Sequence, residues 1–113
     1  LKKVFYSEYF LQENPQHLLF LLYDTQNQAI STSMLYLPQD KTKAAGHYCW
    51  GTLSKHRNNG AMGSLIRKML DLSQDKGYSS SVAHCYNTSI NLAKKNGFVT
   101  QGEILYFSNI KYD

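Results

Sequence analysis

The sequence predicts a single α/β domain in which antiparallel strands lead into a parallel strand–helix–strand unit. Three observations carry this prediction: a pair of apolar runs separated by a polar turn, an amphipathic segment with helical spacing, and glycines on either side of that segment. Paired apolar runs with a short turn between them form a hairpin. A strand–helix–strand unit requires a right-handed crossover between parallel strands. With 113 residues the chain can build one core but not two, so we expect residues 1–113 to be one domain.

The first part of the chain is predicted to contribute a helix and a β-hairpin. Residues 1–13 place apolar and aromatic side chains at a spacing that favours a helix lying on a sheet. Pro15 ends this helix, because the residue before a proline avoids helical dihedral angles. Residues 18–24 form an almost continuous apolar run, which indicates a strand covered on both faces. Residues 29–37 alternate well enough to be the second strand of the hairpin.

A third strand and the main helix follow. Residues 47–53 are predicted to form a strand with Tyr48, Trp50 and Thr52 on one face, because side chains alternate along a strand. Residues 60–76 carry apolar side chains at helical spacing, and they predict an amphipathic helix that packs on the sheet.

The last third of the chain is predicted to continue as strand, short helix and strand. Gly77 is expected just past the main helix, where a left-handed residue is common. Residues 79–86 form the fourth strand, and residues 87–95 hold a short helix with its cap. Gly97 ends this helix, and residues 98–110 form the last strand.

Charge and composition exclude several classes of protein. The net charge of +4 and a pI near 9.1 favour an anionic ligand, but the positive side chains are spread along the chain, so we expect no nucleic-acid partner. Cys49 and Cys85 form no Cys-x-x-Cys pair, which favours a reducing interior and a cytoplasmic location. No apolar run approaches about 20 residues, so we expect no membrane-spanning segment. Since the chain starts at Leu1 without a methionine, we expect it to be a fragment or one domain of a longer protein.

A basic, glycine-containing loop is predicted between the third strand and the main helix. Arg57 supplies a cation, and Gly60 and Gly63 lack the Cβ atom that would keep a ligand away from the backbone. The first N–H groups of the helix have no partner within it, and the helix dipole favours an anion at that end. The sequence therefore predicts a phosphate or pyrophosphate site at this junction.

Two motifs in this order resemble those of the Gcn5-related N-acetyltransferases. The family's first motif, Arg/Gln-x-x-Gly-x-Gly/Ala, wraps the pyrophosphate of acetyl-coenzyme A between a strand and a helix. The corresponding stretch of this chain is Arg57, Asn58, Asn59, Gly60, Ala61, Met62 and Gly63, followed by Ser64. The second motif is a short helix that ends in Lys-x-Gly-Phe, and Lys95, Asn96, Gly97 and Phe98 match it, with Asn87, Ser89 and Leu92 ahead of it.

The resemblance implies a fold and a set of binding residues. It implies a mixed sheet whose parallel strands splay apart to form a gap for acyl-coenzyme A. Residues 57–64 would hold the pyrophosphate, Thr52 and Leu53 would line the pantetheine arm, and Asn87 would reach it from the other side. A backbone N–H near Leu53 would polarise the thioester carbonyl. The implied activity is transfer of an acetyl or other acyl group to a primary amine, with acyl-coenzyme A as co-substrate and no metal.

The sequence departs from the family pattern in three places. Met62 stands where the family has Gly or Ala, so Gly63 would tighten the loop instead. Ala93 stands where many members carry a tyrosine that protonates the departing thiolate. The first strand that usually precedes the N-terminal helix is not expected in this chain.

The catalytic residues are less well defined by the sequence. His84 is the first candidate for a general base, because a neutral imidazole takes up a proton near neutral pH, and a hydrogen-bonded structural role is its alternative. Tyr86 or Cys85 is a candidate for the missing proton donor, although Tyr86 also fits a packing role. Further candidates for the base are His47, Cys49 and Glu103. A zinc site built from His47, Cys49, His84 and Cys85 is conceivable, but adjacent strand residues point to opposite faces, so we expect no metal.

Two other functions stay open from the sequence. The chain could be a catalytically weak acyl-coenzyme A-binding regulatory module of a larger protein, which Ala93 and the missing first strand would favour. It could also be a nucleotide-binding interaction domain, which would bind ATP as well as coenzyme A. A homodimer could form through the tyrosine-rich last strand, whose edge would otherwise need protection.

Overall fold

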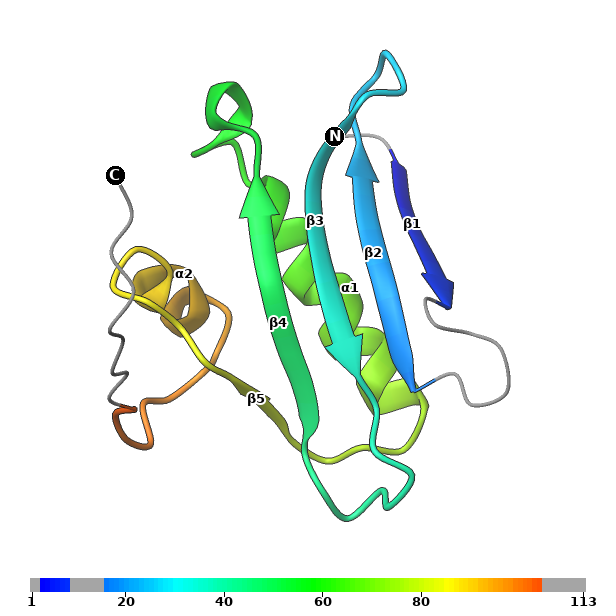
Figure 1. Cartoon of the computed structure of the whole chain (residues 1–113), viewed down its shortest axis with the longest axis vertical. Helices are drawn as coiled ribbons and strands as arrows, with labels where there is room; N and C mark the ends of the chain where they lie inside the picture. The colour runs from blue at the N-terminus through cyan, green and yellow to red at the C-terminus, as the bar shows by residue number, and fades with distance from the viewer. Residues whose placement is uncertain (1–2, 9–15, 105–113) are drawn as a thin grey trace, which may run out of the picture.

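A computed structural model describes residues 3–8 and 16–104, which form a five-stranded mixed sheet with one long helix on one face (Figure 1). The elements are β1 (Lys3–Glu8), β2 (His17–Tyr23), β3 (Ala29–Tyr36), β4 (Ala45–Thr52), the 3₁₀-helix η1 (Ser54–His56), α1 (Ala61–Asp75), β5 (Ser81–Ala83) and α2 (Ile90–Lys95). The strands are ordered β1-β2-β3-β4-β5; the first four pair antiparallel, and β4 pairs parallel with β5. The predicted fold class is confirmed.

The N-terminal helix predicted over residues 1–13 is wrong where the structure describes it. Lys3–Glu8 is strand β1, which pairs antiparallel with β2 from Lys3 opposite Tyr23 to Glu8 opposite Leu18. Aromatic and β-branched residues favour strands, and an available sheet edge outweighs a weak helical spacing. A strand therefore precedes the hairpin where the sequence predicted a helix and no earlier strand. Residues 1–2 and 9–15 lie outside the described part of the chain.

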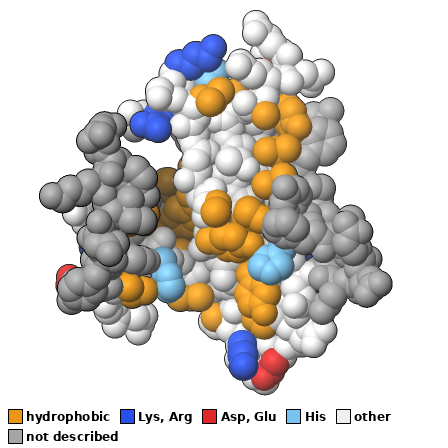
Figure 2. All heavy atoms as spheres, in the orientation of Figure 1, with side chains coloured by type: hydrophobic (Ala, Val, Ile, Leu, Met, Phe, Trp, Pro, Cys, Tyr) orange, Lys and Arg blue, Asp and Glu red, His pale blue; other side chains and the backbone are white. Residues whose placement is uncertain are grey.

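The hairpin of β2 and β3 is confirmed, but β2 is not buried evenly on both faces. Leu18, Phe20 and Leu22 are at most 2% exposed, whereas Leu19 and Leu21 between them are half-buried. The buried set faces α1, and the opposite face of the sheet presents hydrophobic side chains to the viewer in Figure 2. The continuous run of leucines hides this alternation, because the side chains on the two faces are equally apolar.

Helix α1 supplies the other half of the core. Leu65, Ile66 and Met69 are fully buried against the sheet, as their helical spacing predicts. The helix ends at Gly77, whose φ of +97° and N–H bond to the Gln74 carbonyl confirm the predicted left-handed terminus. Among the described residues, no helix is both long and apolar enough to cross a membrane.

We expect Gly77→Ala to lower the free energy of unfolding by about 1 kcal/mol, because only glycine adopts a positive φ without cost. The new Cβ atom would lie 3.6 Å from the Lys41 side chain, an ordinary contact, so the loss comes from the backbone alone. Urea unfolding measures the change. Gly102→Ala is the matched control, since nothing lies within 4 Å of its new Cβ atom and its φ is not positive; an equal loss in both variants would contradict the prediction.

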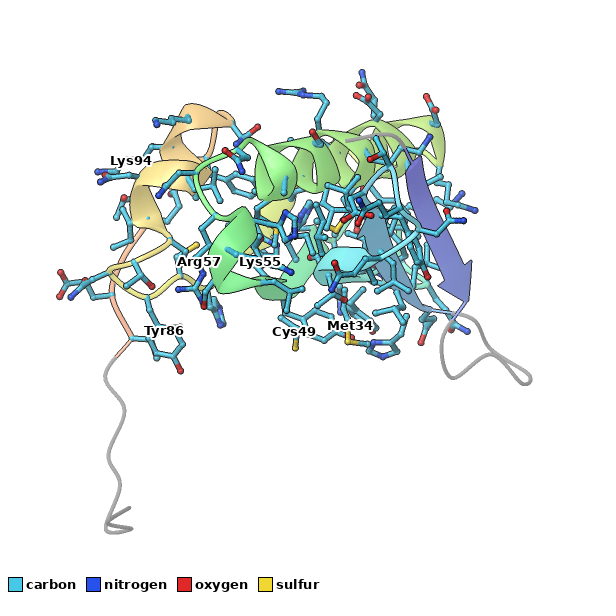
Figure 3. All side chains as sticks on the ribbon, turned by 90° about the horizontal axis from the view of Figure 1, so that it is seen from above. Met34, Cys49, Lys55, Arg57, Tyr86 and Lys94 are labelled. Carbon is cyan, nitrogen blue, oxygen red and sulfur yellow. The ribbon has the colours of Figure 1, made fainter. Side chains whose placement is uncertain are left out.

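Strand β4 contains a β-bulge at Cys49, which has a φ of +58°. Thr32 lies opposite Gly51, and Met34 lies opposite Tyr48, so one residue of β3 faces two of β4. A bulge inserts one residue into a strand and changes which face the following side chains occupy. Figure 3 shows Met34 and Cys49 together on the face away from α1.

The bulge overturns the predicted faces of this strand. Tyr48 lies on the outer face, where its hydroxyl is 2.5 Å from His17 Nδ1. Trp50 lies instead beside buried His47, with their ring centroids 6.3 Å apart. Thr52 is hydrogen-bonded through Oγ1 to the Oγ atom of buried Ser31 at 2.8 Å. Trp50 and Thr52 therefore share the inner face, and Tyr48 does not.

The last third of the chain is less regular than predicted. The fourth strand is Ser81–Ala83 rather than residues 79–86, and helix α2 is confirmed as Ile90–Lys95. Residues 98–104 form no strand, and residues 105–110 of the predicted last strand lie outside the described residues. The parallel pairing of β4 and β5 is therefore short.

Candidate functional site

The loop between β4 and α1 is held close to the end of β4. The Arg57 side chain donates a hydrogen bond from Nε to the Thr52 carbonyl, at 3.1 Å. Asn58 and Gly60 have φ values of +65° and +79°, so the chain turns sharply twice before the helix begins. The exposed Arg57 side chain is thereby tied to the end of β4, in the loop that leads into α1.

The first turn of α1 presents backbone rather than side chains. Nothing lies within 4 Å of the position that a Cβ atom would take on Gly60 or Gly63. Ser64 donates from Oγ to the Gly60 carbonyl at 3.1 Å, while the side chains of Ala61 and Met62 turn into the core. Met62, where the family pattern has Gly or Ala, thus leaves the loop surface clear. The open N–H groups, the helix dipole and Arg57 together fit a pyrophosphate.

Positive charge gathers at this end of the sheet. Lys55 lies in η1 and Arg57 directly after it, and both side chains are exposed (Figure 3). Figure 2 shows Lys and Arg side chains near the end of β4. Asn59 is also exposed in this loop, and it presents an amide without charge. An anion entering here meets cations and helix N–H groups, and the described loop residues 53–60 include no carboxylate.

Strands β4 and β5 part soon after they pair. They pair at three positions, ending with His47 opposite Ala83, and β4 then runs on to Thr52. We call the region between the two strands beyond this last pair the β4–β5 fork. It corresponds to the splayed gap that the family resemblance implied.

The backbone at the end of β4 corrects one expectation. The Leu53 N–H donates to the Ile30 carbonyl at 2.9 Å, so it is engaged with β3 and cannot polarise a thioester carbonyl. Because successive N–H groups point to opposite edges of a strand, the Thr52 N–H points towards the fork. Leu53 itself is 44% exposed, and its side chain remains available to a ligand.

A cluster of three rings lies where the strands part. The His47 centroid is 5.4 Å from that of Phe98, and Trp50 is 6.1 Å from Phe98. His47 is 3% exposed, and its burial lowers the pKa of the imidazole to about 4, so it is neutral at neutral pH. The sequence placed His47 near the site but gave no sign of Trp50 or Phe98 beside it, because the bulge and the turn after α2 bring them there.

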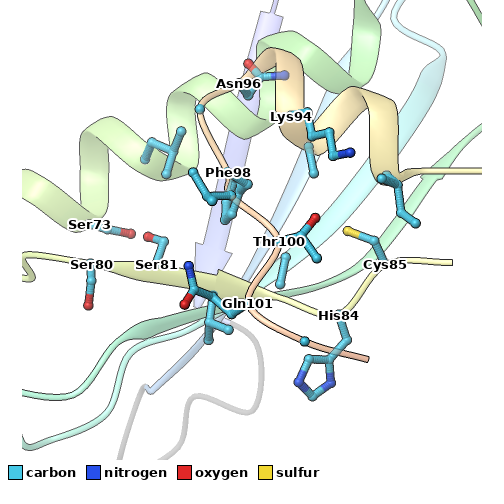
Figure 4. A pocket seen from close by; sticks show the side chains of 18 of the residues that line it. Ser73, Ser80, Ser81, His84, Cys85, Lys94, Asn96, Phe98, Thr100 and Gln101 are labelled. Carbon is cyan, nitrogen blue, oxygen red and sulfur yellow. The ribbon is translucent and has the colours of Figure 1, made fainter. Parts of the chain in front are cut away.

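His84 and Tyr86 lie in a different place from the basic loop. They line a cavity of about 1400 Å³ beside β5, together with Asn87 and the chain after α2 (Figure 4). Its lining includes none of the residues from Thr52 to Ser64. Tyr86 is 73% exposed, and His84 and Asn87 are also exposed. The structure thus brings the loop residues together at one site and the predicted catalytic residues at another.

The described residues include no group of three His, Cys, Asp or Glu side chains that could hold a metal ion. Two of the four residues considered for zinc are separated by the bulge, since His47 is buried on the inner face and Cys49 is exposed on the outer one. They cannot bind one ion together without refolding β4.

Comparisons with known proteins agree with this arrangement. The sequence model of the acetyltransferase (GNAT) family matches residues 2–98. No curated protein matches the sequence. Many solved structures are similar, and those described below are acetyltransferases.

Three of these structures illustrate the likeness. Glucosamine-6-phosphate N-acetyltransferase from Arabidopsis thaliana has a TM-score of 0.74 and 11% identity, over 84% of this chain and 68% of its own. An acetyltransferase from Trypanosoma brucei has a TM-score of 0.72 and 13% identity, over 82% of this chain and 69% of its own. Aminoglycoside N-acetyltransferase AAC(6')-Iy in complex with coenzyme A has a TM-score of 0.73 and 14% identity, over 89% of this chain and 81% of its own.

At these identities the structural likeness concerns the fold alone. The family match is stronger evidence, because it spans most of the chain and includes β4, the basic loop and α1. The mixed sheet, the fork and the open N-terminus of α1 are the features that the resemblance predicted. The chain therefore belongs to the acetyltransferase (GNAT) family.

Proposed function

We propose that this protein transfers an acyl group, with acetyl as the first candidate, from acyl-coenzyme A to a primary amine. The observation that carries the proposal is the loop that leads into α1. Its backbone is open at Gly60 and Gly63, Arg57 stands beside it, and it opens at the end of the β4–β5 fork. Family membership supports the same reaction class.

Each part of the co-substrate would have its own contacts. Residues 57–64 would bind the pyrophosphate through backbone N–H groups and the Arg57 guanidinium. The pantetheine arm would lie along the edge of β4, with the Thr52 N–H, the Leu53 side chain and Asn87 as contacts. Acyl-coenzyme A supplies an activated thioester, and these residues fix its position relative to the amine.

Proton transfer is assigned to the residues beyond β5. We propose His84 as the base and Tyr86 as the proton donor, since both are exposed beside one cavity that an acceptor can enter. His47 is a poor alternative, because an imidazole with a pKa of about 4 takes few protons from an amine at neutral pH. Ala93 is 6% exposed within α2, and its methyl side chain cannot donate a proton to the departing thiolate.

We expect Arg57→Glu to weaken acetyl-coenzyme A binding at least about 100-fold, because a charge-assisted bond is replaced by repulsion of the pyrophosphate. Isothermal calorimetry with acetyl-coenzyme A measures the affinity, and ATP is the ligand control. Lys68→Glu is the matched variant, since it makes the same charge change on an exposed position of α1 beyond the first turn.

Three outcomes of these measurements would contradict the proposed function. If Arg57→Glu and Lys68→Glu weaken binding equally, the effect is one of overall charge and the loop is not the site. If ATP binds as tightly as acetyl-coenzyme A, the site is a general nucleotide site. Binding followed by no turnover with any of a panel of primary amines would contradict the transferase assignment.

Other expectations go with this proposal. We propose that the protein is cytoplasmic and that it acts on a primary amine rather than on nucleic acid. The two unpaired cysteines support the first expectation and the spread of positive charge supports the second. The homodimer through the last strand stays a prediction, which sedimentation of the purified chain tests.

A further inference from the structure

Four buried ring nitrogens have no hydrogen-bond partner among the described residues of the chain. One is Nε2 of His56 in η1; the other three, Nδ1 and Nε2 of His47 and Nε1 of Trp50, belong to two neighbouring side chains of β4. Buried polar atoms in folded proteins are nearly always paired, because leaving one unpaired is costly. Two such side chains in contact, with ring centroids 6.3 Å apart, indicate a site for a polar group of a ligand.

The ring nitrogens of His47 and Trp50 lie at the narrow end of the β4–β5 fork. His47 is the last β4 residue that pairs with β5, and Trp50 is on the same face of β4 beyond the bulge. The end of the fork away from them opens at Thr52 and the basic loop. A ligand whose phosphates occupy the loop and whose arm follows β4 therefore brings its far end towards the two rings.

We propose that the indole N–H of Trp50 and the ring N–H of His47 bind the acyl carbonyl oxygen of acyl-coenzyme A. This inference rests on the proposed function and adds the residues that hold the reacting group. An indole nitrogen only donates, and a neutral imidazole has one donor, so a carbonyl oxygen with two lone pairs matches both. The two rings lie edge to face, with their centroids 6.3 Å apart and their planes at 88°.

The same pair would act on the transition state. When the amine nitrogen bonds to the carbonyl carbon, the oxygen takes up negative charge until the carbon–sulfur bond breaks. The proton lost by the amine ends on the departing thiolate sulfur. Neutral donors fixed in a dry site stabilise such a charge more than they stabilise the ground-state carbonyl.

Phe98 controls access to these donors. Its ring contacts both His47 and Trp50, and it also lines the cavity of about 1400 Å³ beside β5. The ring is half-buried and follows Gly97, which has a φ of +93°. It has open space to turn into when an acyl group enters the narrow end of the fork.

Trp50 is the only tryptophan of the chain, so it reports on its own site. We expect acetyl-coenzyme A to change the tryptophan fluorescence of the unchanged protein more than coenzyme A does, since coenzyme A lacks the acyl carbonyl. We expect Trp50→Phe, which keeps a ring and removes the N–H, to weaken acetyl-coenzyme A binding about three- to tenfold and to leave coenzyme A binding unchanged. Tyr48→Phe removes a hydroxyl from the outer face of β4 and is the matched control.

Comparing acetyl-coenzyme A with coenzyme A distinguishes the possible results. Equal weakening of both by Trp50→Phe, or no weakening of either, would overturn the inference and leave Trp50 with a packing role. An equal fluorescence response to both ligands would overturn it without relying on a variant that folds. If the unchanged protein binds neither acetyl-coenzyme A nor coenzyme A, the proposed function itself is wrong. That result differs from equal effects on both ligands, which would overturn only the inference about Trp50 and His47.

Discussion

Acidification from pH 6.5 to about 4 is expected to cost this protein about 3 kcal/mol of folding stability through His47 alone. Burial lowers the pKa of His47 from 6.5 to about 4 in the folded chain. Below pH 6.5 the unfolded chain takes up a proton that the folded chain refuses, so unfolding becomes more favourable. The stability is complete above pH 6.5 and is lost progressively until the folded imidazole also titrates.

Urea unfolding at a series of pH values measures this loss, and His47→Phe isolates it. Phenylalanine keeps a ring against Trp50 and Phe98 but has no proton to bind. All other ionisable groups are common to both proteins, so the difference between the two curves belongs to His47. Parallel curves between pH 6.5 and 4 would show that the imidazole is not kept neutral by the fold.

We expect Leu65→Ala to lower the free energy of unfolding by about 2 to 5 kcal/mol, which would unfold much of a marginally stable domain. Leu65 is 0% exposed on the inner face of α1, where it belongs to the core cluster shared with β2 and β3. The substitution removes buried methyl groups and leaves a cavity that the close-packed core fills only in part.

Leu53→Ala makes the same chemical change at a position that is 44% exposed. We expect it to change the unfolding free energy by less than about 1 kcal/mol, because most of the lost surface already meets water. The shift of the urea midpoint gives both values. Similar losses at the two positions would mean that the core does not lie between α1 and the sheet.

The sequence predicted the elements that have a strong local signal. The hairpin, the amphipathic α1 and the glycine that ends it all follow from apolar spacing and turn residues. The N-terminal segment was assigned wrongly, since residues 3–8 form a strand only because an edge of β2 is available for pairing. The residues with which a strand pairs are distant in the sequence, so the local pattern of apolar residues does not predict the pairing.

The site was predicted in part for the same reason. Arg57, Gly60 and Gly63 are close together in the chain, so a motif could locate them. Trp50 and Phe98 are far apart in the chain, and they meet through the bulge and the turn after α2. The hydrogen bond from the Leu53 N–H to the Ile30 carbonyl could not be predicted from the sequence either, because it depends on the register between β3 and β4.

The bulge at Cys49 determines which side chains of β4 lie on the inner face of the sheet and which lie on the outer face. Before it, His47 belongs to the inner face; after it, Trp50 and Thr52 do. If the same residues ran in regular alternation without the bulge, both would lie on the outer face and different side chains would line the fork. An insertion or deletion in β4 that the bulge does not absorb would therefore exchange the inner-face side chains beyond it, whereas deletion of Cys49 itself would keep Trp50 and Thr52 on the inner face.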